Sequence, residues 1–391
     1  MKKLMMMFAV ACLSLTALSG CSTDSGSNGG SGENTSDKVK IGLHYELTGE
    51  AADYGNKELK GSKLAIKLAN EAGGNFEAVE MDDKSSEEEA VSVSTNLMSQ
   101  GVVGVVGPAT SGASAATYPV SEQFAIPVIS PSATANGITF HNPSDPNSGV
   151  YETAWRICFE DSYQGAAMAT FAYDTLKAKK VVVYFDNSTD YSKGLQQSFE
   201  TKFVEKGGEI VAVENYQSGD TDFNSVLTKI KGMDFDMLYL PGYYNEVGLI
   251  IDQAKKMGIE TIICGGDGFE STDLIGLAGG AQNLNDIYFT TSYTTVNASD
   301  ALQKFIDDYK AEYNEDPNLF SALAYDATNL LIQAANEAGN DPAAVNEYLK
   351  TVKFDGITGS FTFDETHTPV KSVLVTEMQN GVQISAVSAN P

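Results

Sequence analysis

Residues 101–134 constrain the fold of this chain more than any other stretch. They read as an apolar strand at 102–106, a turn rich in hydroxyl side chains, an alanine-rich helix, a second strand at 126–129 and a second hydroxyl-rich turn. Short β-branched runs of this kind fit parallel strands that are buried on both faces. Two parallel strands joined by a helix form a right-handed crossover. The stretch therefore predicts an open, parallel α/β sheet.

The same alternation of strand and helix continues through most of the chain. Further strands are predicted at residues 39–44, 76–81, 180–185, 209–214, 236–240, 261–264 and 287–292. Further helices are predicted at residues 54–71, 86–99, 164–177, 191–206, 222–231, 245–257, 271–277, 301–313, 320–338 and 342–352. The tail differs, because it predicts short strands at 361–363, 372–376 and 382–387, with Asn380-Gly381 as a hairpin turn.

A proline-containing loop at 139–151 interrupts the alternation, which restarts at residue 164. The chain therefore contains two α/β units, and neither looks complete without the C-terminal pieces. The predicted fold class is α/β, with two Rossmann-like doubly wound lobes, a multi-crossover hinge and a cleft between the lobes. Lobe 1 is expected at residues 38–156 plus about 292–352, and lobe 2 at about 157–291 plus about 353–391.

The N-terminus predicts export and lipidation. Residues 1–20 combine two lysines with a short apolar run, which is typical of a secretory signal peptide. Leu-Ser-Gly before Cys21 resembles the bacterial lipobox, in which that cysteine is acylated; the alternative is an ordinary signal with an incidental cysteine. Residues 21–37 then form the lipidated cysteine and a flexible Gly/Ser linker. We expect an extracytoplasmic monomer, held to the bacterial cell membrane by the lipid anchor on Cys21.

Composition and motifs argue against several functions. The formal net charge of -27 disfavours binding to nucleic acid. His44, His141 and His367 have no nucleophile or metal-ligand motif beside them, and no dinucleotide or phosphate-binding loop occurs. We therefore expect no enzyme activity, no catalytic residue, no metal and no cofactor.

Two cysteines and one arginine leave alternatives open. Cys158 and Cys264 could form a disulfide in an exported protein, although two free thiols are the expectation. Arg156, the only arginine of the chain, could clamp a carboxylate. Its position at the first lobe crossover favours a hinge ion pair with Asp161 instead.

Polar side chains follow the predicted strands where open α/β sheets bind ligands. Ser and Thr hydroxyls at the start of a helix suit a carboxylate, although the same residues are also ordinary helix caps. In the second unit, the loops DNSTDY (186–191), PGYYN (241–245) and GGDGF (265–269) place tyrosines and an acid at strand ends. Hydroxyls from one lobe and a carboxylate with tyrosines from the other would together bind a zwitterion.

The sequence resembles the substrate-binding proteins of branched-chain amino acid ABC transporters, which have the type I periplasmic-binding-protein fold. The likeness rests on KIGLHYELTGEAADYGNKELKG, on GVVGPATSGAS and IPVISPSAT, and on DSYQG, YYNE, GGDGF and LAYDA, in this order. It implies a receptor that captures an amino acid, branched-chain or similar aliphatic, in the cleft and delivers it to an ABC permease. The alternatives are a ligand-sensing ectodomain of the same fold, or a binder of another carboxylate such as an aromatic acid or short peptide.

The resemblance also implies roles for individual residues. Ser111 and Thr134, with the backbone at Ser132, match positions that hold the ligand carboxylate, and Asp267 matches the acid that meets the ammonium group. The remaining matches are Tyr191 and Tyr243, which close the second lobe, and Tyr54, Ala109, Thr110 and Phe320 around the ligand side chain. A disulfide common in the family is absent, since neither Ser85 nor Thr110 is cysteine. Thr110 also adds polarity to a pocket expected to be apolar.

Overall fold

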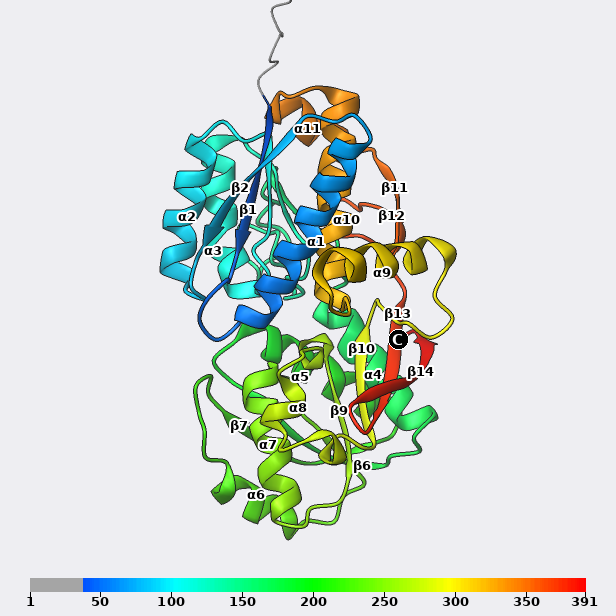
Figure 1. The fold of residues 1–391 in the computed structure, drawn as a ribbon. Helices are drawn as coiled ribbons and strands as arrows, with labels where there is room; N and C mark the ends of the chain where they lie inside the picture. The colour runs from blue at the N-terminus through cyan, green and yellow to red at the C-terminus, as the bar shows by residue number, and fades with distance from the viewer. Residues whose placement is uncertain (1–37) are drawn as a thin grey trace, which may run out of the picture. The chain divides into compact units, whose positions relative to one another are not determined.

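The computed structural model describes residues 38–391. The predicted signal peptide, Cys21 and the linker lie outside the described residues. The alternating pattern of the sequence becomes two separate sheets, each covered by helices (Figure 1).

The first sheet has five parallel strands in the order β2-β1-β3-β4-β5. Their bounds are β1 Val39–Tyr45, β2 Phe76–Asp82, β3 Gly104–Val106, β4 Val128–Ser130 and β5 Ala154–Arg156. The helices between them are α1 Ala52–Glu71, α2 Glu87–Ser99 and α3 Ser111–Phe124. The predicted parallel sheet is confirmed. Strand β5 was not predicted, because Ala-Trp-Arg does not belong to a β-branched apolar run.

The second sheet has seven strands in the order β14-β13-β10-β9-β8-β6-β7. Strands β6 to β10 are parallel, and the C-terminal hairpin β13–β14 is added antiparallel to β10. The strands are β6 Lys180–Asp186, β7 Glu209–Tyr216, β8 Met237–Tyr239, β9 Ile262–Gly265, β10 Ile287–Thr291, β13 Val373–Gln379 and β14 Val382–Ala389. The helices are α4 Asp161–Asp174, α5 Asp190–Glu205, α6 Asn224–Lys231, α7 Tyr244–Lys256 and α8 Leu274–Leu277, with 3₁₀ turns η1 Asp267–Phe269 and η2 Ala281–Asn283.

The predicted hairpin turn at Asn380-Gly381 is confirmed. Both residues have positive φ angles, of 50° and 73°, as a type I′ turn requires.

Three helices return from the second sheet to the first: α9 Asp300–Tyr313, α10 Leu319–Ala338 and α11 Pro342–Leu349. Helix α10 lies directly beside α1, with the orange and blue helices adjacent in Figure 1. The approach is close because Gly61 of α1 has no side chain: a Cβ there would lie 2.0 Å from the carbonyl oxygen of Ser321. Leu64 and Ile66 of α1 and many apolar residues of α10 share one buried core.

A two-stranded ribbon follows, with β11 Lys353–Gly356 and β12 Gly359–Thr362. Phe354 and Phe361 pack in the same core as α1 and α10. The ribbon therefore packs with the first sheet. Residues from about 353 were expected in lobe 2.

The chain crosses from one lobe to the other three times, after β5, after β10 and after β12. Arg156, at the first passage, is fully buried. Its Nε donates to Thr368 Oγ1 of the third passage at 2.9 Å, and its Nη1 donates to the Ala135 carbonyl at 2.8 Å. Its ion pair is with Glu160. The expected partner, Asp161, was therefore wrong, although the residue does join the crossovers.

Trp155 and the two cysteines of the described chain are also buried within the protein. The Trp155 ring stacks on His367 with centroids 3.7 Å apart, and its Nε1 donates to Asn346 Oδ1 at 2.8 Å. Cys158 and Cys264 are free and buried, and burial raises the pKa of both thiols. The expectation of two free thiols is confirmed.

Candidate ligand-binding site

An inner cavity lies between the two lobes, at the carboxyl ends of their strands. The empty space between its lining atoms, counted to its opening, is about 250 Å³. Nine of the ten residues named from the sequence line it, together with Gly268. These nine are Tyr54, Ala109, Thr110, Ser111, Ser132, Tyr191, Tyr243, Asp267 and Phe320. Thr134 does not line the cavity, although it is buried nearby.

The start of α3 forms one wall of the cavity, and some of the hydrogen-bond donors there already have a partner within the protein. The buried Glu46 carboxylate accepts hydrogen bonds from Ala109 N at 3.0 Å, Thr110 N at 2.9 Å and Thr110 Oγ1 at 2.7 Å. Burial, with Asp83 nearby, raises the pKa of Glu46 to about 7. These donors therefore serve the protein's own carboxyl group, and Thr110 also acts as the N-cap by accepting from Ala113 N.

Ser111, the next residue, differs from Thr110. Its Oγ accepts from Ala135 N at 3.1 Å, so the hydroxyl proton stays available for an acceptor in the cavity. Ser132 hydrogen-bonds the buried Glu58 carboxyl at 2.5 Å and the Ala109 carbonyl at 2.8 Å. The Thr134 carbonyl accepts from Asp161 N at 2.9 Å, and the Thr134 hydroxyl has no partner of hydrogen-bonding geometry among the described residues.

Asp267 comes from the second lobe and supplies a buried carboxylate to the cavity. It opens η1 and is 3% exposed. Its Oδ1 accepts from Tyr191 OH at 2.8 Å and from Gln164 Nε2 at 3.1 Å. Burial raises the pKa of Asp267 to about 6, and the two hydrogen bonds oppose the rise. The carboxyl group is therefore mostly ionised at neutral pH and can meet a cation.

Gln164 was not named from the sequence, although it belongs to the DSYQG segment. Its Nε2 also donates to Asp161 Oδ1 at 2.8 Å, and its Oε1 accepts from Thr290 Oγ1 at 2.5 Å. Gln164 therefore holds Asp267 from α4. Glu46 and Glu58 were also not named from the sequence. Glu46 directly follows the first strand and Glu58 lies within the first helix, and nothing else in the sequence distinguishes these two acids.

Aromatic rings close the rest of the cavity. The ring centroids of Tyr54 and Phe320 are 4.3 Å apart, and those of Tyr54 and Tyr243 are 5.7 Å apart. Tyr191 stacks on Tyr243 at 5.0 Å. This surface suits an aliphatic side chain, while Ser111 and Asp267 contribute polar atoms from the two lobes.

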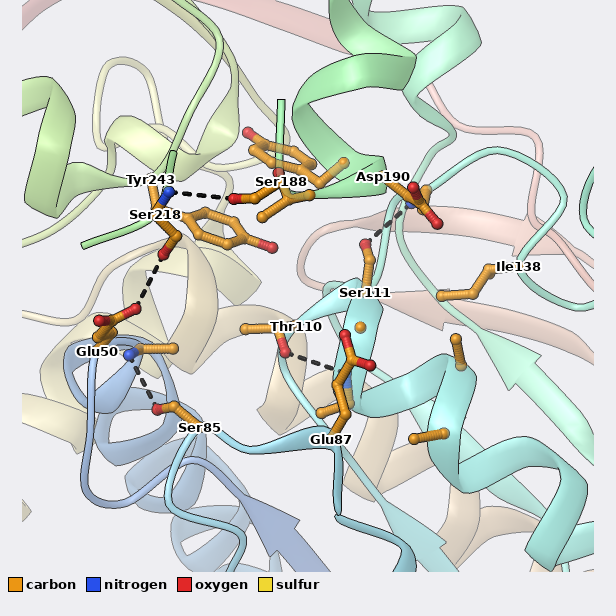
Figure 2. A pocket seen from close by; sticks show the side chains of 18 of the residues that line it. Glu50, Ser85, Glu87, Thr110, Ser111, Ile138, Ser188, Asp190, Ser218 and Tyr243 are labelled. Carbon is orange, nitrogen blue, oxygen red and sulfur yellow. Dashed lines mark hydrogen bonds between the residues drawn. The ribbon is translucent and has the colours of Figure 1, made fainter. Parts of the chain in front are cut away.

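A second, outer cavity adjoins the first and shares Thr110, Ser111, Tyr191 and Tyr243 with it. It encloses about 1550 Å³, counted to its open mouth. Figure 2 shows Thr110, Ser111 and Glu87 on one side and Ser188, Asp190, Ser218 and Tyr243 on the other. The acids that line it are Glu50, Glu87, Asp190 and Glu246, and its lining includes no Lys, Arg or His. The cleft is thus strongly acidic toward solvent.

Within residues 38–391, no group of three or more His, Cys, Asp or Glu side chains could hold a metal ion. In the same part of the chain, no helix combines the length and the hydropathy that crossing a membrane requires.

Known proteins resemble this chain in sequence and in fold. The family described as periplasmic binding protein matches residues 38–383. The leucine-, isoleucine-, valine-, threonine- and alanine-binding protein of Pseudomonas aeruginosa is 30% identical over 335 residues, covering 84% of this chain and 86% of that protein.

Two solved structures match over nearly the whole described region. The branched-chain amino acid transporter substrate binding protein LivJ of Streptococcus pneumoniae, in complex with isoleucine, is 42% identical with a TM-score of 0.84, covering 90% of this chain and 100% of that one. A leucine binding protein of Thermotoga maritima is 34% identical with a TM-score of 0.82, covering 90% and 99%. The chain belongs to the periplasmic binding protein family, a family of extracytoplasmic solute-binding proteins and not of enzymes.

Proposed function

We propose that this protein captures a branched-chain or similar aliphatic amino acid in the inner cavity and delivers it to an ABC permease. One observation carries the proposal: a buried carboxylate from the second lobe, Asp267, and a hydroxyl from the first, Ser111, line the same small cavity together with several aromatic rings. The relative with 42% identity holds isoleucine. Closure of the lobes over the ligand shifts an open–closed equilibrium, and tighter binding to the closed form supplies the free energy.

The ligand is proposed to lie with its charged ends at opposite walls. Asp267, held by Tyr191 and Gln164, receives the ammonium group. Ser111 and the backbone at Ser132 receive the carboxylate. The side chain contacts Tyr54, Tyr243 and Phe320, with Ala109 and Thr110 beside it. The Ala109 and Thr110 amides already donate to Glu46, so they are not counted among the donors to the ligand carboxylate.

The same proposal covers location and organisation. The lipobox-like segment supports a lipid anchor on Cys21 and removal of residues 1–20, and residues 21–37 would tether the lobes to the membrane. A monomer suffices, because both walls of the cavity come from one chain. We propose lobe 1 as residues 38–156 plus about 292–362, and lobe 2 as about 157–291 plus about 363–391, which follows the packing of Phe354 and Phe361.

A thermal-shift screen tests the function on the chain that begins after residue 21. We expect isoleucine, leucine and valine to raise the unfolding midpoint at saturating concentration, because a ligand that binds only the folded state stabilises it by RT ln(1 + [L]/Kd). Lysine and aspartate are the matched controls. A response only to aromatic acids or short peptides, or to none of the amino acids, would contradict the proposal.

Lowering the pH is expected to weaken ligand binding and to stabilise the ligand-free protein. The affinity for isoleucine should fall about tenfold between pH 7 and pH 5, as Asp267 takes up a proton with its pKa of about 6. The ligand-free protein should become more stable over the same range. Glu46, Asp267 and Glu270 have pKa values raised to about 7, 6 and 7, so the folded state binds more protons than the unfolded state.

Burial lowers the pKa of His367, which opposes the gain in stability at low pH. This single group is set against the three carboxyl groups of Glu46, Asp267 and Glu270. Isothermal titration and thermal unfolding at each pH measure the two effects. A constant affinity down to pH 5 would show that Asp267 does not meet the ammonium group.

A further inference from the structure

Residues 50–54, which lead into and begin α1, join the first lobe to three loops of the second. The Glu50 carboxylate accepts from Ser218 Oγ after β7 at 2.9 Å, a bond drawn in Figure 2. The Glu50 carbonyl accepts from Tyr244 OH at 3.0 Å and from Asn245 Nδ2 at 2.7 Å, both at the start of α7.

Asp53 makes the most complete of these connections, with both of its carboxylate oxygens. Its Oδ2 accepts from Ser271 Oγ at 2.7 Å and from Thr272 N at 3.0 Å, and its Oδ1 accepts from Thr272 Oγ1 at 3.0 Å. No Lys or Arg within the described chain forms an ion pair with Asp53, so the hydroxyl and amide donors of the second lobe are its partners. Asp53, Ser271 and Thr272 line neither the inner nor the outer cavity.

The next residue, Tyr54, connects these contacts to the ligand. Its ring lines the inner cavity, its hydroxyl donates to the Gly268 carbonyl at 2.5 Å, and it accepts from Tyr244 N at 3.2 Å. The hydrogen bonds of Asp53 and Tyr54 span the two lobes, so they can form only when the lobes are closed. Bonds that exist in one state of a two-state equilibrium shift it toward that state.

We propose that Asp53 is a positioning residue that clasps Ser271 and Thr272 in the closed state and sets how slowly the ligand leaves, without touching it. The inference rests on the proposed function, because it concerns release from the same cavity. Hydrogen bonds to a charged group stabilise more than neutral ones. Because the ligand enters and leaves while the lobes are open, bonds made only in the closed state slow opening, and so they act on dissociation more than on association.

Stopped-flow measurement of isoleucine binding tests the clasp. Asp53→Ala should raise the dissociation rate roughly tenfold while the association rate stays within about twofold. Asp300→Ala is the matched control, since Asp300 also lies in the first turn of a helix of the first lobe and hydrogen-bonds no described residue of the second. Ser271→Ala should have a smaller effect than Asp53→Ala. Adding Ser271→Ala to Asp53→Ala should change nothing further, because the acceptor is already gone.

An unchanged dissociation rate in Asp53→Ala, an equal effect of Asp300→Ala, or additive effects of the Asp53 and Ser271 variants would each overturn the clasp. Binding of isoleucine by the unaltered protein is a separate result. If the unaltered protein binds no amino acid, the proposed function fails. Small-angle scattering still decides the clasp in that case, because Asp53→Ala should lower the compact fraction of the ligand-free protein and Asp300→Ala should not.

Discussion

Asp267→Asn is expected to weaken the binding of isoleucine at least about 30-fold while leaving the fold intact. The substitution removes the charge and keeps an oxygen that can accept from Tyr191 and Gln164. Removing one partner of a buried, hydrogen-bonded charge pair weakens binding by about 2–5 kcal/mol, which is roughly 30-fold to several thousand-fold in Kd. Isothermal titration at pH 7 measures the loss.

Two further variants sharpen that result. Asp267→Glu should retain most of the affinity, because it keeps a carboxylate at the same wall. Asp307→Asn, at an exposed position of α9, controls for the loss of one negative charge from an acidic protein and should bind as the unaltered chain does. Full affinity in Asp267→Asn would show that the zwitterion arrangement is wrong, even if isoleucine binds.

Gly61→Ala is expected to destabilise the protein by about 3 kcal/mol, at the upper end of typical overpacking effects, because the atom that it strikes is backbone. The new Cβ would lie 2.0 Å from the Ser321 carbonyl oxygen and 2.9 Å from its carbon, so α1 and α10 must separate. Helix α1 carries Tyr54 and α10 carries Phe320, whose rings touch in the inner cavity. Binding should therefore weaken together with the fold.

Urea unfolding measures the change in the free energy of unfolding. Gly276→Ala is the control, since a Cβ there meets open space and alanine favours a helix over glycine. It should be neutral or slightly stabilising. Similar losses in both variants would show that close contact between α1 and α10 is not what requires Gly61.

Much of the fold could be read from local patterns. Runs such as KVVVYF and the amphipathic segment of α1 carry their period within a few residues, so β6 and α1 were predicted within two residues of their observed ends. Strands β5 and β11 were not predicted. Their sequences, Ala-Trp-Arg and Lys-Phe-Asp-Gly, contain no apolar run, and each strand pairs with a neighbouring strand that offers hydrogen bonds.

The candidate site divides in the same way. Tyr191, Tyr243 and Asp267 follow strands of a parallel sheet, which places them at one edge whatever the packing. The partner of a charged group depends instead on segments far apart in the chain. Glu46 accepts from Thr110, Gln164 holds Asp267, and Arg156 donates to Thr368.

The sequence by itself therefore determined the class of fold, the family and nearly all of the residues that line the inner cavity, because these depend on short-range order along the chain. Only the tertiary structure decided which donors at α3 remain available beside Glu46, and which residues join the closed lobes at Asp53. Hydrogen bonds and buried charges act over a few ångströms, so their partners are chosen by the packing of distant segments and leave no pattern in the sequence.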